Sequence, residues 1–386
     1  MIGRPASLRV YNKRAIVRAL LRHAPASRAD LAKQIGMSQV TAGKIVDELL
    51  SDGVVEETDP QEPKAANRLG RPGRMLRLNT SHSPFLAIQL GSSHTRLARV
   101  PLGLHGEDQW SATFETPKSA DEWKRRLTKA SRELDSDEVV AALVSVPGVV
   151  DERSGRVLLA PNLHWLDTIN LMEIVGEATG KRVTLLQEIR ALAYGQLAVE
   201  PIDAKRAADF LLVDFGDGLG AAAAISGKLY VGPLALNGEL GHTPVVGNLR
   251  HCGCGAVGCI ETLVNRAGLL ESFAEETGMT GVTWGQLTGH IEQNGLPEWF
   301  RKSLEQVATA VAAAANVMGI GRVIITGSMT ELPPVVIEHL SAAVINGCLW
   351  KRFGQMICHG APRHRLAGLI AAGIDRIVMP VESWER

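Results

Sequence analysis

The stretch that decides the fold runs from Asn237 to Glu261 and reads NGELGHTPVVGNLRHCGCGAVGCIE. It places three of the five cysteines, Cys252, Cys254 and Cys259, within eight residues, and His242 stands ten positions before the first of them. Thiolate sulfur and imidazole nitrogen are the ligands that four-coordinate zinc prefers, and three cysteines with one histidine complete a tetrahedron. We therefore predict one structural Zn2+ per chain, held by these four side chains.

Two alternatives to this ligand set exist. His251 is a rival fourth ligand, but neighbouring side chains in an extended chain diverge, so His251 and Cys252 are poorly placed to share one ion. The other alternative is a glycine-rich turn with free buried cysteines. Such close clustering of cysteines is more typical of a metal site, and we therefore favour His242 as the fourth ligand.

The same stretch carries a family resemblance. The patterns G-E-x-G-H at 238–242 and C-x-C-G-x-x-G-C-x-E at 252–261 resemble the signature of the ROK family. That family contains bacterial repressors and sugar kinases. The resemblance implies an α/β, two-lobed, actin-like (ribonuclease H-like) ATPase fold. It assigns residues 81–386 to this region, with lobe one at about 81–195 plus a closing helix at about 365–386, and lobe two at about 196–364. Within these lobes we expect a helix over 261–277, and the segment 365–378 resembles the closing helix itself.

Charge is unevenly distributed along the chain, although 41 Lys and Arg balance 41 Asp and Glu. Residues 1–78 hold 14 Lys and Arg against 8 Asp and Glu, a balance of +6, which leaves −6 on the remainder. A basic head on an acidic body indicates nucleic-acid binding at the front of the chain. The length of 386 residues is enough for two or three domains with substantial cores.

The first 80 residues are typical of a winged helix-turn-helix domain. A helical apolar pattern covers 11–21, and Ser27 and Ser38 are N-caps for two further short helices, the second with Val40, Ile45 and Leu49 facing inward. Two short helices joined by a tight turn form a helix-turn-helix, whose second helix enters the major groove.

Two strands at 54–57 and 75–78 form the predicted wing, and the basic segment between them is too rich in Gly, Pro and Arg to pack. Arg71, between Gly70 and Pro72, resembles a residue that reads the minor groove. The residues predicted to contact DNA are Arg28, Ser38, Gln39, Thr41, Lys44, Arg68, Arg71 and Arg74. The alternative is a three-helix protein-interaction module with a solvated basic loop.

Three positions depart from the pattern of the family's kinases. Gln89 stands where the kinases have an aspartate that helps to hold magnesium, and an amide cannot supply the charged oxygen that this ion favours. Asp217 replaces a threonine in the second phosphate loop, and a carboxylate repels a triphosphate. Glu188 replaces the aspartate that serves as catalytic base, which moves the carboxylate by one methylene. We therefore predict no kinase activity and no ATP.

The sugar-facing residues implied by the resemblance are mostly retained. They are Gly148, Asn162, Glu188, Glu239, His242 and Glu261. A zinc ion bound to His242 also pins the loop that carries Glu239 and Glu261, so that both carboxylates are preorganised as acceptors. A pocket that keeps its sugar side and loses its phosphate machinery is typical of a sensor derived from a kinase.

The sequence thus predicts a transcription regulator, a repressor, that binds a palindromic double-stranded DNA operator and senses a sugar or sugar derivative. Symmetric operators imply a homodimer or a dimer of dimers. Five cysteines, with three assigned to a metal, indicate a reducing compartment, and no signal peptide or membrane span is recognised, so we expect a cytoplasmic protein. Two rival functions are an active sugar kinase with a DNA-binding head and a regulator switched by a protein partner.

Overall fold

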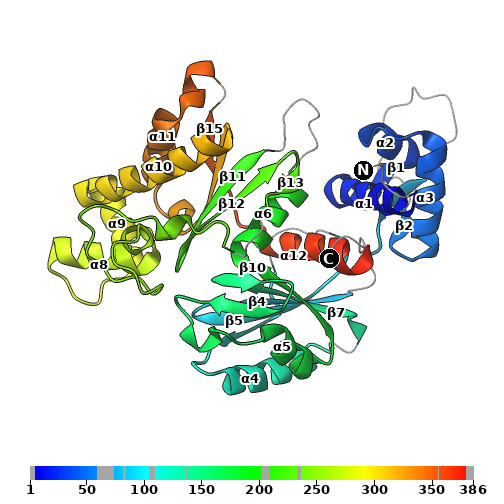
Figure 1. The fold of residues 1–386 in the computed structure, drawn as a ribbon, viewed down its shortest axis with the longest axis horizontal. Helices are drawn as coiled ribbons and strands as arrows, with labels where there is room; N and C mark the ends of the chain where they lie inside the picture. The colour runs from blue at the N-terminus through cyan, green and yellow to red at the C-terminus, as the bar shows by residue number, and fades with distance from the viewer. Residues whose placement is uncertain are drawn as a thin grey trace.

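Two five-stranded sheets and a small winged head make up the protein (Figure 1). The computed structural model describes residues 5–58, 74–80, 84–103, 109–135, 138–200, 209–232, 236–354 and 356–379. Arg68 and Arg71, two of the predicted DNA contacts, lie outside the described residues. Among the described helices, none combines the length and the apolar character needed to cross a membrane.

The described residues of the head form three helices and a three-stranded sheet. In chain order its elements are α1 (Pro5–His23), β1 (Ala26–Ser27), α2 (Arg28–Gln34), α3 (Gln39–Ser51), β2 (Val55–Thr58) and β3 (Met75–Leu78). Both predicted N-caps are confirmed. Ser27 and Asp30 form a capping box on α2, and Ser38 Oγ accepts the Thr41 amide at 3.1 Å on α3.

One inward-facing prediction in α3 is wrong. Val40 is 71% exposed, whereas Ala42, Ile45, Val46 and Leu49 are buried. These four positions follow the i, i+3, i+4, i+7 spacing of one helix face, and Val40 lies outside that stripe. The N-terminal end of α3 therefore presents an apolar side chain to solvent beside Gln39 and Thr41.

The first large sheet has the strand order β10-β7-β4-β5-β6. Strands β4, β7 and β10 run parallel, whereas β5 and β6 are antiparallel to their neighbours. The strand bounds are β4 (Phe85–Leu90), β5 (His94–Val100), β6 (Ala112–Glu115), β7 (Ala141–Val146) and β10 (Arg182–Gln187). A hairpin of β8 (Val149–Asp151) and β9 (Arg156–Leu159) follows β7.

The second sheet repeats the topology of the first, with the order β13-β12-β11-β14-β15. In both sheets the first strand of the set is central, two antiparallel strands follow on one side, and two parallel strands lie on the other. The bounds are β11 (Phe210–Phe215), β12 (Leu219–Ile225), β13 (Lys228–Leu229), β14 (Arg322–Gly327) and β15 (Ile357–Gly360). This duplicated arrangement is the predicted actin-like, ribonuclease H-like fold.

Helices cover the sheets on both faces and join them. Helices α4 (Ala120–Glu133) and α5 (Leu171–Thr179) pack on one face of the first sheet, and α12 (Arg365–Gly373) packs on the other. Helix α6 (Glu188–Val199) contributes to the cores of both sheets. The remaining helices, on the second lobe, are α7 (Glu261–Val264), α8 (Arg266–Thr277), α9 (Trp284–Asn294), α10 (Glu298–Met318) and α11 (Pro334–Gly347).

Two helices differ from the sequence-based expectation. The helix predicted over 261–277 is interrupted at Asn265, whose side chain caps α8 by accepting the Gly268 amide at 2.7 Å. The closing helix predicted over 365–378 is α-helical only to Gly373 and continues as a π-helix over Ile374–Val378. Single π-helical turns are rare and occur frequently at functional sites.

Helices α6 and α12 cross at very short range, which glycine makes possible. A Cβ atom added at Gly368 of α12 would lie 1.8 Å from the Ala191 carbonyl oxygen, and one added at Gly195 of α6 would lie 1.8 Å from the His364 carbonyl oxygen. Both contacts are to backbone, which cannot rotate away. The close approach of the two helices therefore requires glycine at both positions.

The substitution Gly368→Ala should lower the free energy of unfolding by about 3 kcal/mol or more, because the methyl group must push the two helices apart. The matched control is Gly176→Ala in α5, where the nearest atom to an added Cβ is 3.8 Å away. That control should be neutral or stabilising by up to about 1 kcal/mol. Denaturant unfolding of both variants measures the difference, and equal stability of the two would contradict the close crossing.

Candidate functional site: a cysteine and histidine cluster beside an interlobe cleft

Four side chains from the stretch 237–261 converge on one point. Cys254 Sγ lies 3.7 Å from Cys259 Sγ, and Cys252 Sγ lies 3.6 Å from His242 Nδ1. All four ligand atoms lie within 4.8 Å of one another. Tetrahedral zinc with bonds of about 2.3 Å to sulfur and about 2.1 Å to nitrogen separates its ligand atoms by roughly 3.6–3.8 Å. The observed spacing fits an ion of this size.

The rival ligand His251 lies apart from this cluster. Its backbone pairs with Val257 in an isolated bridge, its residue is exposed, and it is not part of the metal-ligating group found in the described portion of the chain. The chain reverses between Cys252 and Cys259, and this turn brings the three sulfur atoms together. The geometry therefore favours His242 over His251.

His242 also faces the interior of the neighbouring cleft. Its Nε2 atom lies 3.6 Å from Glu239 Oε2, on the opposite side of the ring from the cysteines. Burial raises the pKa of Glu239, and burial likewise raises the pKa of Glu261, whose Oε2 accepts the Leu219 amide at 2.8 Å. The two carboxylates thus stand at the boundary between the cluster and the cleft, in fixed positions.

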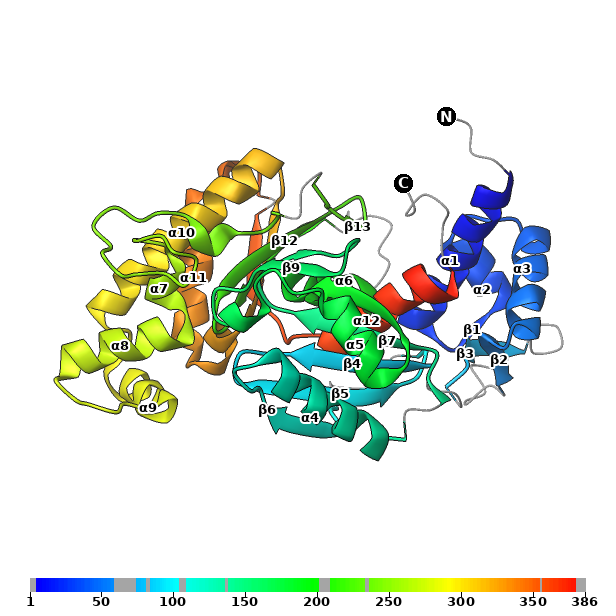
Figure 2. The same cartoon turned by 60° about the horizontal axis from the view of Figure 1, so that its bottom comes forward.

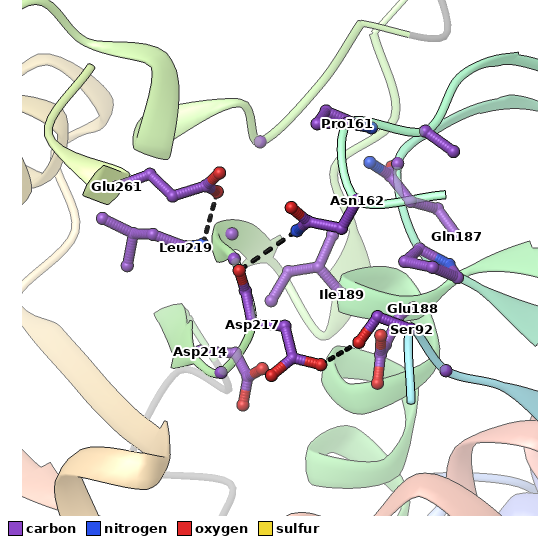
Figure 3. A pocket seen from close by; sticks show the side chains of 18 of the residues that line it. Ser92, Pro161, Asn162, Gln187, Glu188, Ile189, Asp214, Asp217, Leu219 and Glu261 are labelled. Atoms are coloured by element: carbon purple, nitrogen blue, oxygen red, sulfur yellow. Dashed lines mark hydrogen bonds between the residues drawn. The ribbon is translucent and has the colours of Figure 1, made fainter. Parts of the chain in front are cut away.

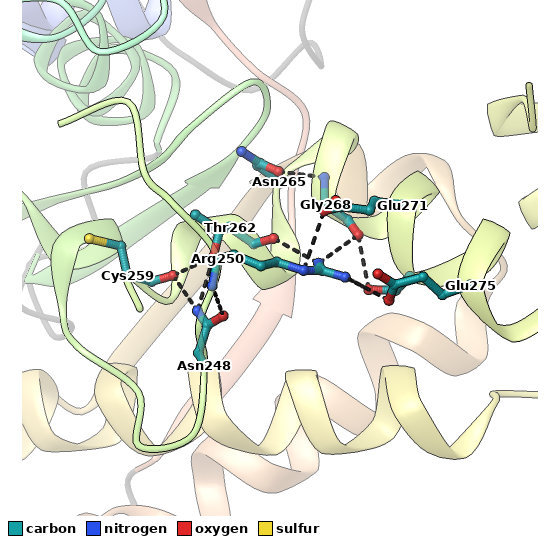
Figure 4. A network of polar contacts seen from close by, with 9 residues as sticks. Asn248, Arg250, Cys259, Thr262, Asn265, Gly268, Glu271 and Glu275 are labelled. Carbon is teal, nitrogen blue, oxygen red and sulfur yellow. Dashed lines mark hydrogen bonds and ion pairs between the residues drawn. The ribbon is translucent and has the colours of Figure 1, made fainter. Parts of the chain in front are cut away.

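Arg250 holds the cysteine-bearing loop against helices α7 and α8 (Figure 4). Its guanidinium donates to the carbonyl oxygens of Thr262 at 3.0 Å and Gly268 at 3.1 Å. It also pairs with the carboxylates of Glu271 at 3.3 Å and Glu275 at 3.1 Å. The two carbonyl groups lie where α7 ends and α8 begins, so one side chain ties the loop to the helix interruption at Asn265.

The cleft lies between the two sheets, at the carboxyl ends of their parallel strands (Figure 3). Ligands of open α/β sheets bind at such edges, where strand ends leave backbone groups and polar side chains unoccupied. All six predicted sugar-facing residues line it: Gly148, Asn162, Glu188, Glu239, His242 and Glu261. The three altered positions, Gln89, Glu188 and Asp217, line the same cleft.

Polar contacts inside the cleft connect the lobes. Gln187 Nε2, at the end of β10, donates to Glu239 Oε1 at 3.0 Å, and Asn162 Nδ2 donates to the Asp217 carbonyl oxygen at 3.1 Å. Gly148 has a φ of +87°, and a Cβ there would lie 2.3 Å from the Leu159 carbonyl oxygen. The glycine is therefore required by the β8–β9 hairpin itself, whatever the cleft binds.

Ion pairs fill the other end of the cleft. Arg363 pairs with Asp214 through Nε at 2.7 Å and Nη2 at 2.9 Å, and Arg365 pairs with Glu188. Burial alone would raise the pKa of Asp214, but the Arg363 charge outweighs it and holds that pKa below its ordinary value. The Asp214 carboxylate is therefore charged and fully engaged.

The glycine turns at this end are covered by the same arginine. A Cβ added at Gly216 would lie 2.9 Å from Arg363 Nη2, and one added at Gly327 would lie 2.4 Å from it. Across the mouth of the cleft, the Ser92 hydroxyl hydrogen-bonds to the Asp217 carboxylate. These contacts place a cation at the two glycine turns and a hydrogen bond from Ser92 to the turn that carries Asp217.

Comparison with known proteins decides the family. The profile of the ROK family matches residues 87–366, more than half of the chain. This chain belongs to the ROK family. A second profile, winged helix-turn-helix DNA-binding, matches residues 11–56, which include α2 and α3.

Relatives of this ROK chain include repressors. It is 27% identical over 283 residues to a xylose repressor of Caldicellulosiruptor bescii, covering 70% of this chain and 67% of the relative. It is 23% identical over 364 residues to the DNA-binding transcriptional dual regulator NagC of Escherichia coli, covering 89% and 86%.

Solved structures show the same fold. A ROK family transcriptional regulator, a homolog of the E. coli MLC protein, superposes with a TM-score of 0.73 at 20% identity, covering 95% of this chain and 97% of that one. A ROK family glucokinase from Streptomyces griseus, in complex with glucose and AMPPNP, superposes with a TM-score of 0.61 at 19% identity, covering 75% and 97%. The regulator match spans the head as well as the two lobes.

The predicted DNA contacts of this ROK protein differ in their environments. Gln39, Thr41 and Lys44 are exposed on α3, and Ser38 caps that helix. Arg28 pairs with Asp47 at 2.7 Å, and Arg74 pairs with Glu57. Both arginines are at least 40% exposed in their side chains, so these surface pairs can exchange for phosphate at little cost.

Several charged residues of the site were not indicated by any motif. In the segment APRHR, Arg363 lies just before the closing helix and Arg365 begins it, whereas Glu152 and Arg250 lie in loops without a signature. Arg363 and Arg365 have their partners far along the chain, as Arg363 and Asp214 show with a separation of 149 residues. The partners of Arg250 are nearer, and the Glu275 carboxylate lies 25 residues on. Of these four residues, Arg363 and Arg365 alone offered a sequence signal, because they stand at the start of an apolar helix.

The substitution Arg250→Ala should lower the free energy of unfolding by about 2 kcal/mol, because it leaves partly buried carbonyl groups without their charged donor. The control is Arg301→Ala, which removes an exposed ion pair with Glu298 inside α10. Its effect should stay within about 0.5 kcal/mol. Thermal or denaturant unfolding compares the two, and similar effects would mean that Arg250 does not anchor the loop.

Proposed function

We propose that this ROK protein is a DNA-binding transcriptional repressor that responds to a sugar or sugar derivative bound in the interlobe cleft. The observation that carries the proposal is the division of the cleft. Asn162, Glu239, His242 and Glu261 line one part of the cleft. At the end that faces the glycine turns, Arg363 pairs with Asp214, and Arg365 pairs with the altered residue Glu188. The repressor names of its relatives and the winged helix-turn-helix support the same function.

The proposal divides the chain by role. Residues 1–80 bind DNA, and residues 81–386 form the sensor, with lobe one at about 81–195 and 365–386 and lobe two at about 196–364. The effector binds where the lobes meet, so its contacts differ between open and closed arrangements. A ligand shifts such an equilibrium by its difference in affinity for the two states.

We propose that His242, Cys252, Cys254 and Cys259 hold one structural zinc ion. Zinc bound by four protein ligands supplies folding energy and has no open position for activating water. Glu239 orients the His242 ring, because its carboxylate lies against the ring nitrogen that faces away from the cysteines. The loop then presents Glu239 and Glu261 to the cleft as fixed acceptors. Arg250 stabilises the same loop from behind.

Phosphoryl transfer is disfavoured by the charges in the cleft. Glu188 is paired with Arg365, so an arginine of the closing helix already occupies the carboxylate at this position. Asp217 brings a negative charge to the turn that would face phosphate, and its partner is Ser92 from the other lobe. An active kinase with a DNA-binding head is the rival function, and ATP-dependent stabilisation would support it.

DNA recognition is proposed for α3, with Lys44 on phosphate and Gln39 and Thr41 toward bases. Val40 adds an exposed apolar side chain that suits a thymine methyl group. Arg28 and Arg74 are proposed as further phosphate contacts, with Arg68 and Arg71 of the wing toward the minor groove. A homodimer or dimer of dimers would match a palindromic operator with half-sites one helical turn apart.

One class of sugar should raise the melting temperature of the zinc-loaded protein. The panel contains D-xylose, D-glucose and N-acetylglucosamine, and the 6-phosphates of the last two, each with and without Mg-ATP. A ligand at 100 times its dissociation constant adds about 2.7 kcal/mol of stability. The variant Glu239→Gln should lose much of that shift, and the control Glu138→Gln, at an exposed pair with Arg99, should keep it.

The panel also separates the rival functions. A shift by Mg-ATP would support the kinase. If no sugar raises the melting temperature, the result would contradict the sugar-sensing role and favour a regulator switched by a protein partner.

The substitution Lys44→Ala should weaken binding to double-stranded DNA and reduce its salt dependence, because one phosphate contact is lost. On a labelled random-sequence duplex, the slope of log K against log salt should fall in magnitude by about 0.9. The control Lys129→Ala removes an equally charged side chain, 78% exposed, from α4. Fluorescence anisotropy at several salt concentrations measures both, and an unchanged slope for the α3 variant would contradict its assignment to phosphate.

A further inference from the structure

A line of buried and partly buried polar contacts leads from the cleft to the DNA-binding head. At the head, Arg14 of α1 donates through Nε to the Met379 carbonyl oxygen at 2.8 Å and through Nη2 to the Asp375 carbonyl oxygen. Arg18, one turn further along α1, pairs with the Asp375 carboxylate. The side chain of Asp375 is only 8% exposed. Helix α1 is therefore bound by two arginines to the π-helical end of the closing helix.

The next contacts lead from this π-helix into lobe one. Arg376, adjacent to Asp375, donates to the Glu152 carboxylate at 2.6 Å and to the Leu185 carbonyl oxygen of β10 at 3.0 Å. The same carboxylate pairs with Arg190 of α6 at 3.2 Å. Glu152 thus joins the closing helix to α6.

The final contacts enter the cleft. Glu152 Oε1 accepts the backbone amide of Gln187 at 3.0 Å, and the side chain of Gln187 donates to Glu239 at 3.0 Å. Within the described residues, the buried Oε1 atom of Gln187 has no hydrogen-bond partner. This atom belongs to a residue that lines the cleft, where a hydroxyl of a bound molecule could donate to it.

Burial makes it costly to separate these charged side chains from their partners, so a displacement at one contact is passed to the next. The exposed fractions are 10% for the Glu152 side chain, 8% for Arg190 and 18% for Arg376. A buried charge that loses its partner carries a large desolvation cost, so these groups move together with their partners. Apolar packing follows the same route, because one continuous core contains Ile16 and Leu20 of α1 together with Leu369 and Ile374.

We propose that Glu152, Asp375 and Arg376 couple the cleft to the head, and that they act as positioning residues for the DNA-binding helices. A ligand that bonds to Gln187 or Glu239 displaces the start of α6, Glu152 follows, and the closing helix carries α1 with it. In Figures 1 and 2, the closing helix α12 extends from α6 toward α1. Helix α1 also contacts α6 directly. The proposal rests on the proposed function, because it describes how that cleft acts on DNA binding.

The first test needs neither sugar nor operator. Hydrogen exchange of α1 is measured in the full-length, zinc-loaded protein and in Gln187→Ala, Asp375→Asn and the double variant. The cleft substitution alone should accelerate exchange in α1 by roughly 3- to 30-fold, the range expected of sites that are energetically coupled. In the double variant it should add little to the effect of Asp375→Asn, because the connection is already broken.

The control is Glu200→Gln, which removes a carboxylate of similar burial, 12% exposed, from its pair with Arg322 in the second lobe. It should leave exchange in α1 unchanged. If Asp375→Asn does not fold, Arg18→Ala breaks the same contact from the exposed side of α1. Gln187→Ala with normal exchange in α1, or independent effects that multiply in the double variant, would overturn the proposal.

The second test adds each sugar of the panel. A sugar that raises the melting temperature should change exchange in α1 of the wild type and of Glu200→Gln, but not of Asp375→Asn, in which it should still raise the melting temperature. An equal response in Asp375→Asn would overturn the coupling. If no sugar raises the melting temperature, the sugar-sensing role fails, while the first test still decides whether the contacts couple the cleft to the head.

Discussion

The close crossing of α6 and α12 is the contact on which the remaining architecture depends. Helix α6 belongs to the cores of both sheets, and α12 packs against it with no side chain at Gly368. Because α12 returns from the last strand of the second sheet, the crossing ties the end of the chain to lobe one. The same helix continues into the π-helical turn that binds α1. Both lobes and the head therefore share one junction.

Charge compensation shapes the cleft above this junction. Three acidic residues, Glu188, Asp214 and Glu152, lie within it or beside it, and each is paired with an arginine from the closing segment or from α6. Buried charges require such partners. The pairs at Asp214 and Glu188 occupy the end near the glycine turns, whereas the Glu152 pair lies beside the cleft. The opposite end of the cleft is lined by carboxylates and amides. The cysteine and histidine cluster stabilises that open end from the second lobe.

Much of this arrangement could be predicted from local sequence. The caps at Ser27 and Ser38, the buried strands and the cluster of cysteines follow from short-range spacing, and the structure agrees with them. The inward position of Val40 and the unbroken helix over 261–277 were predicted wrongly. Val40 lies off the stripe that tertiary packing selects, and Asn265 is drawn into a cap. The local sequence could not predict the exposure of Val40 or the break at Asn265, because both depend on packing against residues that are distant in the chain.

By itself the sequence determined the family, the winged helix-turn-helix and the four side chains that cluster at 242–259, because the residues involved are close in the chain and chemically distinctive. Tertiary structure alone decided which charges meet. Arg363 reaches Asp214, Arg376 reaches Glu152, and Arg18 reaches Asp375 across separations of 149, 224 and 357 residues. Many charged residues are chemically equivalent in sequence, and only the fold selects their partners. The physical link between the cleft and the head therefore became visible only once the chain was folded.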